Sequence, residues 1–263
     1  MPTISDVDVR RYLDRIEFEL PISIDLETLT ALQRAHLTAV AFENLDVHAG
    51  NRVETGLEWS IPKLLDRDRG GWCFELNGAF SALLRSLGFD VLVLGAAVLL
   101  NGPTRVVDHA TIEVRLDESW LVDVGFGNSF FLPLALNRPG PQDGGSGEFE
   151  FLGSPEGTTM AKLEQGVPVA QYRFKRVAHE LTDFVPASDA LQDDDSNHWR
   201  NKPFATRLLA GGPDRVTLLG DRLKLEQGGS IVETPVESDA WPAVLWEWFR
   251  MLPPSMNGPA NNS

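Results

Sequence analysis

The only cysteine of the chain is its best candidate for a nucleophile. Cys73 lies in the stretch RGGWCFELN at residues 69–77, where two glycines permit a tight turn and an amphipathic helix begins directly afterwards. Cys73 is therefore expected at or near a helix N-terminus, where partial positive charge favours the reactive thiolate. Arg69 adds a cation four residues upstream. Because free cysteines are also common buried fillers, these residues leave a catalytic and a structural Cys73 both open.

A catalytic thiolate usually requires a histidine that accepts its proton and a carboxylate that orients this histidine. His109 opens a strand, and strand ends that face loops often carry functional residues. Asp123 ends the next strand within WLVDVGFG (120–127), where an unpartnered carboxylate is costly to bury, although a surface-edge Asp is an equal alternative. The remaining histidines are expected to be structural or solvated: His36 at the core edge or surface of a helix, and His48, His179 and His198.

The turn between these two strands raises a question of register. A simple hairpin centred on Asp117 and Glu118 pairs His109 with a residue near Phe126 and places it on the face opposite Asp123. Contact between His109 and Asp123 therefore requires a bulge, a bend at the strand end or a different pairing.

Helical patterns come first along the chain and strand patterns follow, which predicts an α+β fold. Apolar spacing predicts helices over Asp6–Ile16, over Asp25–Thr38 and within Asp66–Gly88, with Gly88 as the stop. Two later features are a surface loop by composition at Pro139–Gly147 and a closing amphipathic helix at Trp241–Leu252, with Leu252 on its apolar side. The expected strands include Val91–Leu100, His109–Val114, Trp120–Val124, Pro168–Val177 and Arg215–Leu225.

Composition restricts the classes of partner. The formal net charge of −15 repels nucleic-acid phosphates and anionic membranes, so neither partner is expected. One cysteine excludes an intramolecular disulfide framework and a Cys-rich zinc site, and no metal is predicted. The longest apolar stretch, Val91–Leu100, is about half of what a membrane-spanning helix needs. With no signal-peptide pattern at the start, the expected location is the cytoplasm.

Four separated motifs in order resemble those of the arylamine N-acetyltransferase family. They are FENLD (42–46), RGGWCFELN (69–77), His109 and LVDVGFG (121–127), and the likeness covers about residues 20 to 134. Cys73 and His109 are 36 residues apart, and His109 and Asp123 are 14 apart, which are spacings near those usual in the family.

The resemblance implies a fold and a site. The fold is a helical domain at 1–89 with the nucleophile, an antiparallel β-barrel at 90–195 with the histidine and aspartate, and a small α/β lid at 196–263. Its Cys-His-Asp core is similar to that of cysteine proteases, with Cys73, His109 and Asp123 as the triad. The resemblance also implies an ion pair of Glu43 with Arg69 that braces the loop before Cys73. Substrate would be bound by Phe42, Gly125, Phe126 and Gly127.

The same resemblance implies ping-pong transfer of an acetyl group. Cys73 would take the acetyl group from the co-substrate acetyl-CoA and pass it to a small-molecule arylamine, hydrazine or arylhydroxylamine, without a metal. Since the acidic chain opposes CoA phosphates, a local basic cluster is expected, either Arg173, Lys175 and Arg176 or Arg200, Lys202 and Arg207.

Three other interpretations stay open. Amide synthases resemble the acetyltransferases through the same triad, but take a carrier-bound polyketide chain and release or cyclise it. Papain-like proteases place their histidine much further from the cysteine, whereas transglutaminase-like enzymes share the residue order. A binding protein that kept the fold and lost activity is the third, and the presence of all three triad residues counts against it.

Overall fold

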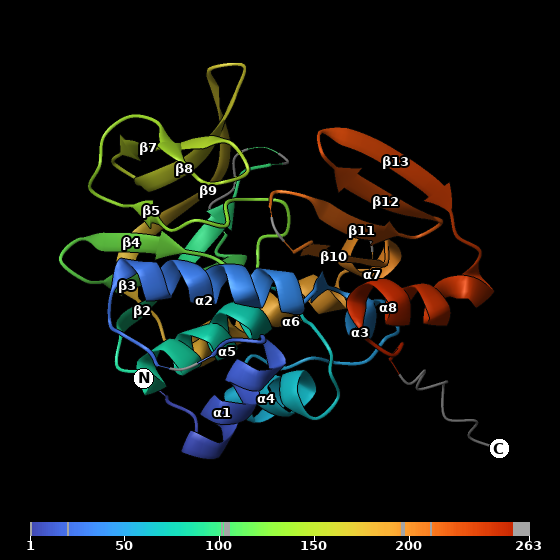
Figure 1. Ribbon diagram of the computed structural model, residues 1–263. Helices are drawn as coiled ribbons and strands as arrows, with labels where there is room; N and C mark the ends of the chain where they lie inside the picture. The colour runs from blue at the N-terminus through green and yellow to red at the C-terminus, as the bar shows by residue number, and fades with distance from the viewer. Residues whose placement is uncertain are drawn as a thin grey trace.

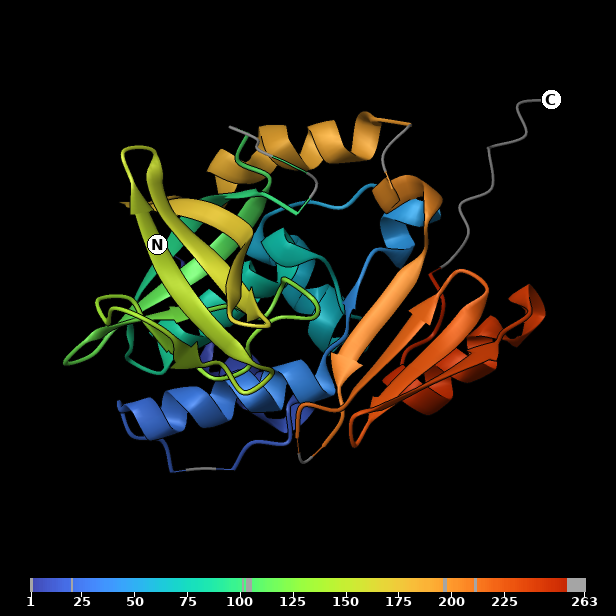
Figure 2. The same cartoon turned by 90° about the horizontal axis from the view of Figure 1, so that it is seen from above.

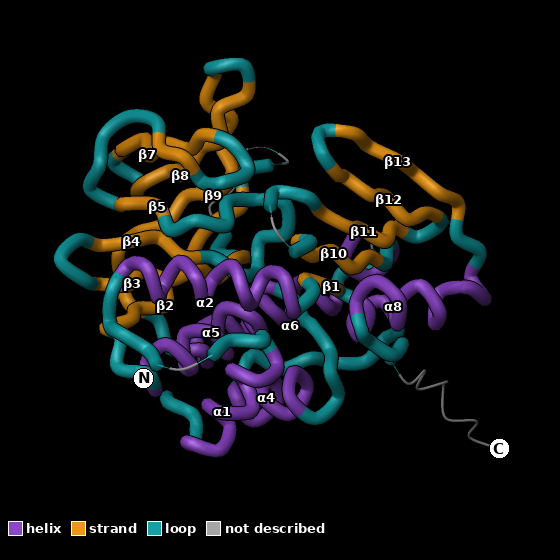
Figure 3. Tube along the Cα trace, in the orientation of Figure 1, coloured by secondary structure: helices purple, strands orange, loops and turns teal. Residues whose placement is uncertain are grey.

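The computed structural model describes residues 2–19, 21–100, 102, 106–195, 198–210 and 212–254. It has an α+β architecture, as predicted, with helices on one side, an eight-stranded antiparallel sheet beside them and a separate five-stranded sheet (Figure 1). Figure 3 shows that most of the helices lie beneath the two groups of strands. No helix in this part of the chain is long and apolar enough to cross a membrane.

The N-terminal helices form where their apolar spacing and their caps agree. Ser5 caps α1 (Asp6–Arg15) and Asp25 caps α2 (Leu26–Ala39) with side-chain oxygens, which satisfies orphan N–H groups of the first turn. The short α3 (Leu45–His48) follows α2. α4 (Leu57–Leu65) was not predicted from the sequence, and it contains Pro62 within the helix.

The helix that carries the cysteine is α5 (Cys73–Ser86), and it is shorter than the predicted range. Residues 66–72 form a turn and an extended segment instead. Gly88, the predicted stop, has φ +102°, the left-handed conformation that glycine adopts at a helix end. α5 packs between α4 and the sheet of β2 (Asp90–Val98) and β3 (His109–Arg115), and it is buried from Cys73 through Leu84. The nucleophile candidate therefore begins a rigid central helix.

The eight-stranded sheet is a near-closed antiparallel barrel with the order β5-β4-β3-β2-β9-β8-β7-β6 (Figures 1 and 2). Its first and last strands do not form a ladder. Instead the side chain of Gln142 donates to the carbonyl oxygen of Ala135 at 3.0 Å and accepts from its N–H at 2.8 Å. One amide thus replaces a strand pair at the seam. The remaining strands are β4 (Ser119–Val122), β5 (Leu134–Ala135), β6 (Gln142–Asp143), β7 (Glu148–Ser154), β8 (Gly157–Glu164) and β9 (Val167–Ala178).

The five-stranded sheet pairs a short strand from the N-terminal part of the chain with four strands from its C-terminal part. Its order is β1-β10-β11-β12-β13, and β1 (Phe42–Glu43) pairs with β10 (Phe204–Leu208), which lies far along the sequence. The predicted strand Arg215–Leu225 is divided at Gly220 into the hairpin strands β11 (Arg215–Leu219) and β12 (Arg222–Gln227). The other elements are β13 (Ser230–Pro235), η1 (Leu181–Phe184), α6 (Val185–Asp193), α7 (His198–Asn201), η2 (Ser238–Ala240) and α8 (Trp241–Phe249).

Three predictions about single segments were wrong in part. His36 is fully buried rather than at the core edge, with its Nδ1 3.1 Å from the Tyr12 hydroxyl. The predicted loop at 139–147 contains β6, because Gln142 turns inward to close the barrel. Leu252 is 63% exposed, since α8 ends at Phe249 and the chain turns at its C-cap, Arg250.

Candidate active site

Glycines allow the chain to place Cys73 close to the barrel. A Cβ on Gly70 would lie 2.0 Å from the carbonyl oxygen of Ala41, so no other residue fits there without movement. A Cβ on Gly125 would lie 2.7 Å from the Cα of Cys73, which brings the end of β4 directly against the first turn of α5. Cys73 is 5% exposed and is the first residue of its helix. The thiol therefore lies at the positive end of the helix dipole.

A one-residue difference in the hairpin brings His109 and Asp123 together. β3 and β4 pair with Arg115 opposite Ser119 and Ile112 opposite Val122, so the turn has three residues rather than the two expected. This register places His109 diagonally to Asp123 on one face, and the imidazole Nε2 lies 2.7 Å from Asp123 Oδ2. Of the three solutions open from sequence, the structure therefore uses a different pairing.

Asn77 holds the aspartate in place from α5, one turn after the cysteine. Its Nδ2 donates to Asp123 Oδ1 at 2.9 Å and to the Ala110 carbonyl oxygen at 2.6 Å, and its Oδ1 accepts from the Val124 N–H at 3.0 Å. Both strands and the helix are thus joined by one buried amide. Sequence reasoning quoted Asn77 within its motif but gave it no role. Its signal was the spacing of four residues from Cys73, which puts both side chains on one helix face.

Burial and neighbouring charge set the protonation of the histidine. Burial disfavours a charged imidazole, but the Asp123 carboxylate and the contact with the Cys73 side chain raise the pKa of His109 to about 10. For Asp123, burial alone would raise the pKa, and the opposing His109 charge and its hydrogen bonds hold it below the usual value. With Nε2 engaged by Asp123, Nδ1 is the ring nitrogen left for the thiol. A charged imidazolium held by the Asp123 carboxylate is therefore the favoured state of His109 at neutral pH.

Aromatic rings surround the histidine and continue toward the five-stranded sheet. Phe126 and Tyr172 lie with their ring centroids 5.0 Å from the His109 centroid. Phe42 packs against Trp199 at 5.8 Å and against Phe204 at 5.4 Å. Tyr172, Trp199 and Phe204 were not singled out from the sequence, because they come from β9, α7 and β10, far beyond the motifs.

The two glycines expected in the substrate site have visible local roles. The Gly125 N–H donates to Asp123 Oδ1 at 2.9 Å, so this amide orients the carboxylate. Gly127 has φ +77°, and a Cβ there would lie 3.2 Å from the Phe42 ring. Both glycines therefore let the segment after β4 pass close to its neighbours, while substrate contact remains a prediction.

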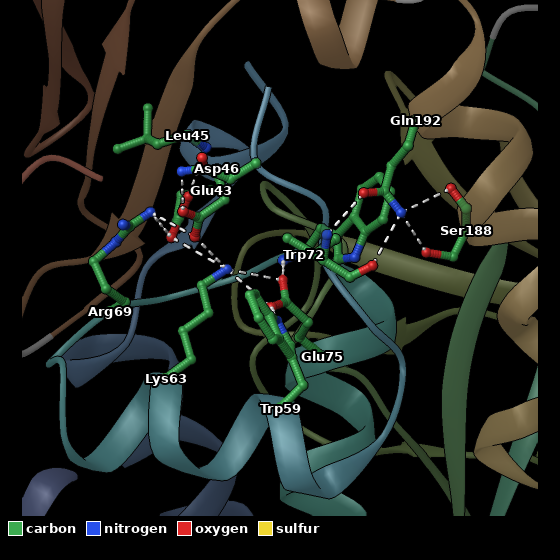
Figure 4. A network of polar contacts seen from close by, with 12 residues as sticks. Glu43, Leu45, Asp46, Trp59, Lys63, Arg69, Trp72, Glu75, Ser188 and Gln192 are labelled. Atoms are coloured by element: carbon green, nitrogen blue, oxygen red, sulfur yellow. Dashed lines mark hydrogen bonds and ion pairs between the residues drawn. The ribbon is translucent and has the colours of Figure 1, made fainter. Parts of the chain in front are cut away.

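A second group of buried charges, here called the support cluster, braces the loop before Cys73 (Figure 4). Arg69 Nη2 lies 2.7 Å from Glu43 Oε1, which is the ion pair that the family resemblance implied. Lys63, not noticed in the sequence, lies at the centre, 2.9 Å from both Asp46 Oδ2 and Glu75 Oε1. The members of the support cluster are Glu43, Asp46, Lys63, Arg69 and Glu75.

Glu75 connects this cluster to the nucleophile helix. It belongs to the first turn of α5, and its Oε2 accepts the Trp72 N–H at 3.1 Å. Its Oε1 also accepts from the Trp59 indole N–H at 2.7 Å. Burial raises the pKa of Glu75, although Lys63 opposes this. Together, these contacts of Glu75 hold the first turn of α5, which begins at Cys73.

The remaining sequence candidates lie outside this site. His48 Nδ1 is 2.6 Å from the Arg200 carbonyl oxygen, His179 Nδ1 is 3.5 Å from Asp183 Oδ2, and the side chain of His198 lies outside the described residues. Within the described ranges, no group of three or more His, Cys, Asp or Glu residues could hold a metal.

The two predicted basic clusters are mostly engaged in other contacts. Arg176 pairs with the buried Glu113 at 2.6 Å, and Arg207 donates to the Trp248 carbonyl oxygen at 2.7 Å. Arg173 and Lys175 line a pocket of about 570 Å³. Since Arg173 pairs with Ala97 while His109 pairs with Ala96, these two lie on the sheet face opposite the catalytic histidine.

A buried thiol at a helix N-terminus, beside a histidine held by a carboxylate, defines a site of the thiol acyl-transfer class. Residues 25–252 match the family model described as N-acetyltransferase. The chain belongs to the arylamine N-acetyltransferase family.

Relatives from several organisms agree with this membership. The chain is 37% identical over 156 residues to the arylamine N-acetyltransferase pineal gland isozyme NAT-3 of Gallus gallus, which is 56% of this chain and about half (53%) of that protein. It is 29% identical over 229 residues to the arylamine N-acetyltransferase of Escherichia coli K12, covering 86% and 81% of the two chains.

Solved structures show the same fold over nearly the whole chain. The arylamine N-acetyltransferase of Salmonella typhimurium superposes with a TM-score of 0.88 at 25% identity, covering 99% of this chain and 95% of that one. The Mycobacterium marinum arylamine N-acetyltransferase in complex with CoA gives 0.85 at 27% identity, covering 92% of each chain. The predicted fold class is therefore confirmed, with N-terminal helices, a near-closed barrel and a further sheet with helices.

Proposed function

We propose that this protein transfers an acetyl group from acetyl-CoA to an arylamine, hydrazine or arylhydroxylamine by a ping-pong mechanism through an acyl-Cys73 thioester. The observation that carries the proposal is the arrangement of His109, hydrogen-bonded to Asp123 at 2.7 Å through Nε2 and in contact with Cys73 on its other side. This is the arrangement that activates a thiol for attack on a carbonyl.

In the first half-reaction, the Cys73 thiolate attacks the carbonyl carbon of the thioester. The tetrahedral intermediate collapses with cleavage of the bond to the CoA sulfur, and the departing CoA thiolate takes the proton from the His109 imidazolium. Asp123 stabilises that imidazolium before transfer and keeps the ring in one orientation. The product is a thioester on Cys73, which stays activated toward an amine.

In the second half-reaction, the amine nitrogen attacks the acetyl carbonyl of this thioester. His109, now neutral, accepts the proton from the amine as the new C–N bond forms. The bond to the Cys73 sulfur breaks, and the thiolate with its imidazolium partner is restored. Electrons and protons balance over the cycle without a metal or an oxidant.

The surroundings of the triad suit an aryl acceptor and a CoA donor. Phe126 beside His109 and Phe42 beyond Gly127 are both half-buried, so each offers a ring face on which an aromatic acceptor can stack. A relative from M. marinum was solved with CoA bound, which favours a CoA thioester over a carrier-bound chain as the donor. The substrate contacts of Phe42, Gly125, Phe126 and Gly127 belong to the same proposal.

Intact-protein mass spectrometry after brief incubation with acetyl-CoA and no acceptor tests this proposal. We expect a gain of one acetyl mass that is absent in Cys73→Ala and is discharged by an added arylamine or hydrazine. No adduct on a thiol that iodoacetamide alkylates well below pH 8 would favour a carrier-bound or longer acyl donor, as in amide synthases. No adduct and a slow thiol would favour a binding protein without the chemistry.

A further inference from the structure

A pocket on the outer side of the support cluster has the composition of a second ligand site. It has a volume of about 610 Å³, within the usual range for small-molecule sites, and lies between the segment after α4 and the C-terminal end of α8. Cys73 does not line it. We propose that this pocket binds a small aromatic carboxylate through Arg67 and Arg250.

Two arginines on its wall are stacked on tryptophans. The Arg67 guanidinium carbon lies 5.0 Å from the Trp59 ring centroid, and that of Arg250 lies 5.9 Å from the Trp246 centroid. Among the described residues, neither guanidinium group forms an ion pair. A guanidinium stacked on a ring keeps its in-plane N–H groups directed outward, and this fork matches a carboxylate.

Each acidic residue of the same wall already has a cationic partner. Asp46 contacts Lys63 at 2.9 Å, and Asp68 contacts Arg15 at 3.6 Å. Asp66 hydrogen-bonds Arg11. A third arginine of the pocket, Arg52, is likewise paired with carboxylates of α6. When these paired charges are set aside, the positive charges of Arg67 and Arg250 are the ones left on the described wall of the pocket. In a chain with a formal net charge of −15, two such charges on one pocket form a local anion site.

The half-buried arginine Arg207 interacts with the charge of Arg250. Burial lowers the pKa of Arg207, and the positive charges of Arg15 and Arg250 lower it further. The Arg250 charge is therefore close enough to act on Arg207, and Glu17 offsets part of this repulsion.

The pocket also exposes apolar surface that an aromatic ring could cover. Trp246 is 52% exposed and Leu252 is 63% exposed, and Pro253 and Pro254 complete this side. Arg250 ends α8 with φ 55°, a left-handed conformation uncommon for residues other than glycine. That turn carries Leu252 away from the core and onto the pocket. Apolar surface next to free guanidinium groups suits a ligand with a flat ring and one carboxylate.

The site is distinct from the catalytic one but shares a wall with its support. Asp46 and Arg69 line the pocket and also belong to the cluster that braces the loop before Cys73 (Figure 4). A ligand in the pocket would contact Asp46 and Arg69 of the support cluster and not the Cys73 thiol. Binding can therefore be measured while the active site is blocked.

The experiment titrates 1-naphthoate into the full chain by isothermal titration calorimetry, with Cys73 first alkylated by iodoacetamide. We expect saturable binding that weakens about tenfold or more in the double variant Arg67→Gln, Arg250→Gln, since each loses a charge-assisted hydrogen bond. Neutral 1-naphthamide and acetate should both bind more weakly than 1-naphthoate. The matched control is Arg138→Gln, because Arg138 also stacks on a tryptophan, Trp120 at 5.9 Å, but already faces Glu118 at 3.9 Å.

Four outcomes would overturn the proposal: no binding of 1-naphthoate to the chain with or without alkylation, equal affinity in the double variant, binding only when Cys73 is not alkylated, or inorganic phosphate binding as tightly as 1-naphthoate. The double variant should keep the wild-type melting temperature because both arginines are exposed. It should also keep the wild-type rate of acetyl transfer, so a failure of this site is distinguishable from a failure of the proposed acetyltransferase activity.

Discussion

Two groups of buried charge meet at the first turn of α5, and they differ in how many partners each charge has. In the support cluster, Lys63 reaches three carboxylates and Arg69 reaches two, so each cation is shared. In the triad, His109 has one carboxylate, Asp123, and a thiol that changes its bonding during the reaction. Both groups are almost fully buried.

This difference separates a group that holds a backbone from a group that performs chemistry. A cation with several partners stays in place when one contact fluctuates, whereas a proton on His109 can leave toward the substrate without the loss of other contacts. The support cluster holds the loop at residues 69–72 in place. In the triad, the contact between His109 and the thiol can change during the reaction. Changes in the triad should therefore act mainly on turnover, and changes in the support cluster should act mainly on stability.

The largest effect is expected for Cys73→Ala. Acyl transfer should be abolished, because no other thiol exists in the chain to form the covalent intermediate. The fold should persist, since the replaced atom is one sulfur. Acetyl-CoA turnover and the melting temperature measure the two effects, with the buried Ser81→Ala on the same helix as the control. Turnover retained in Cys73→Ala would refute the mechanism.

Next in size is Asp123→Asn. An amide cannot stabilise the imidazolium, and it favours the wrong tautomer of His109, so kcat should fall by about 10⁴-fold. Asp143→Asn, which changes an exposed aspartate that accepts the Gly145 N–H, should leave kcat unchanged. Steady-state kinetics with a saturating acceptor measure both. Full activity of Asp123→Asn would mean that another carboxylate orients the histidine.

In the support cluster, Lys63→Met should act on stability. Removal of the ammonium leaves the Glu75 carboxylate buried without its ion pair and takes one of two cations from Asp46, so the free energy of unfolding should fall by about 3–5 kcal/mol. Denaturant unfolding measures the loss, and Lys162→Met, a half-buried lysine over the Phe149 ring, is the control. A loss below about 1 kcal/mol, in the range of surface pairs, would show that the cluster does not brace the loop.

The sequence predicted local features well and long-range partners poorly. Helix patterns, the Gly88 stop and the glycine turn before Cys73 depend on neighbours within a few residues, and the structure contains them. The register of the hairpin depended on one residue of turn length, and that residue decides whether His109 and Asp123 share a face.

The residues that sequence reasoning missed share a physical cause. Lys63 reads as an ordinary helix-surface lysine, and only the packing of α4 on α5 encloses it. Trp199 and Phe204 come after the motifs end and reach Phe42 through the pairing of β1 with β10. Pairing across such separations has no local signature in one chain.

The smallest effect concerns two buried histidines with opposite protonation. Burial and the Arg15 charge lower the pKa of His36 to about 3, so the unfolded chain binds its proton first as pH falls below about 6.5, and stability is lost from there toward pH 3. The pKa of His109 is raised to about 10, so its stabilisation is complete below about pH 6.5 and is lost as pH rises toward 10.

His36→Asn tests the acid side of this contrast. The asparagine retains a polar atom for the Tyr12 hydroxyl but does not titrate, so the loss of unfolding free energy between pH 6.5 and 5, about 2 kcal/mol for wild type, should shrink. Chemical denaturation across pH measures this slope, and the loss above pH 7 should remain because His109 is untouched. The half-buried His179→Asn is the control. An unchanged acid slope in His36→Asn would show that protonation of His36 does not cause the loss of stability in this range, because carboxylates of the unfolded chain bind protons mainly at lower pH.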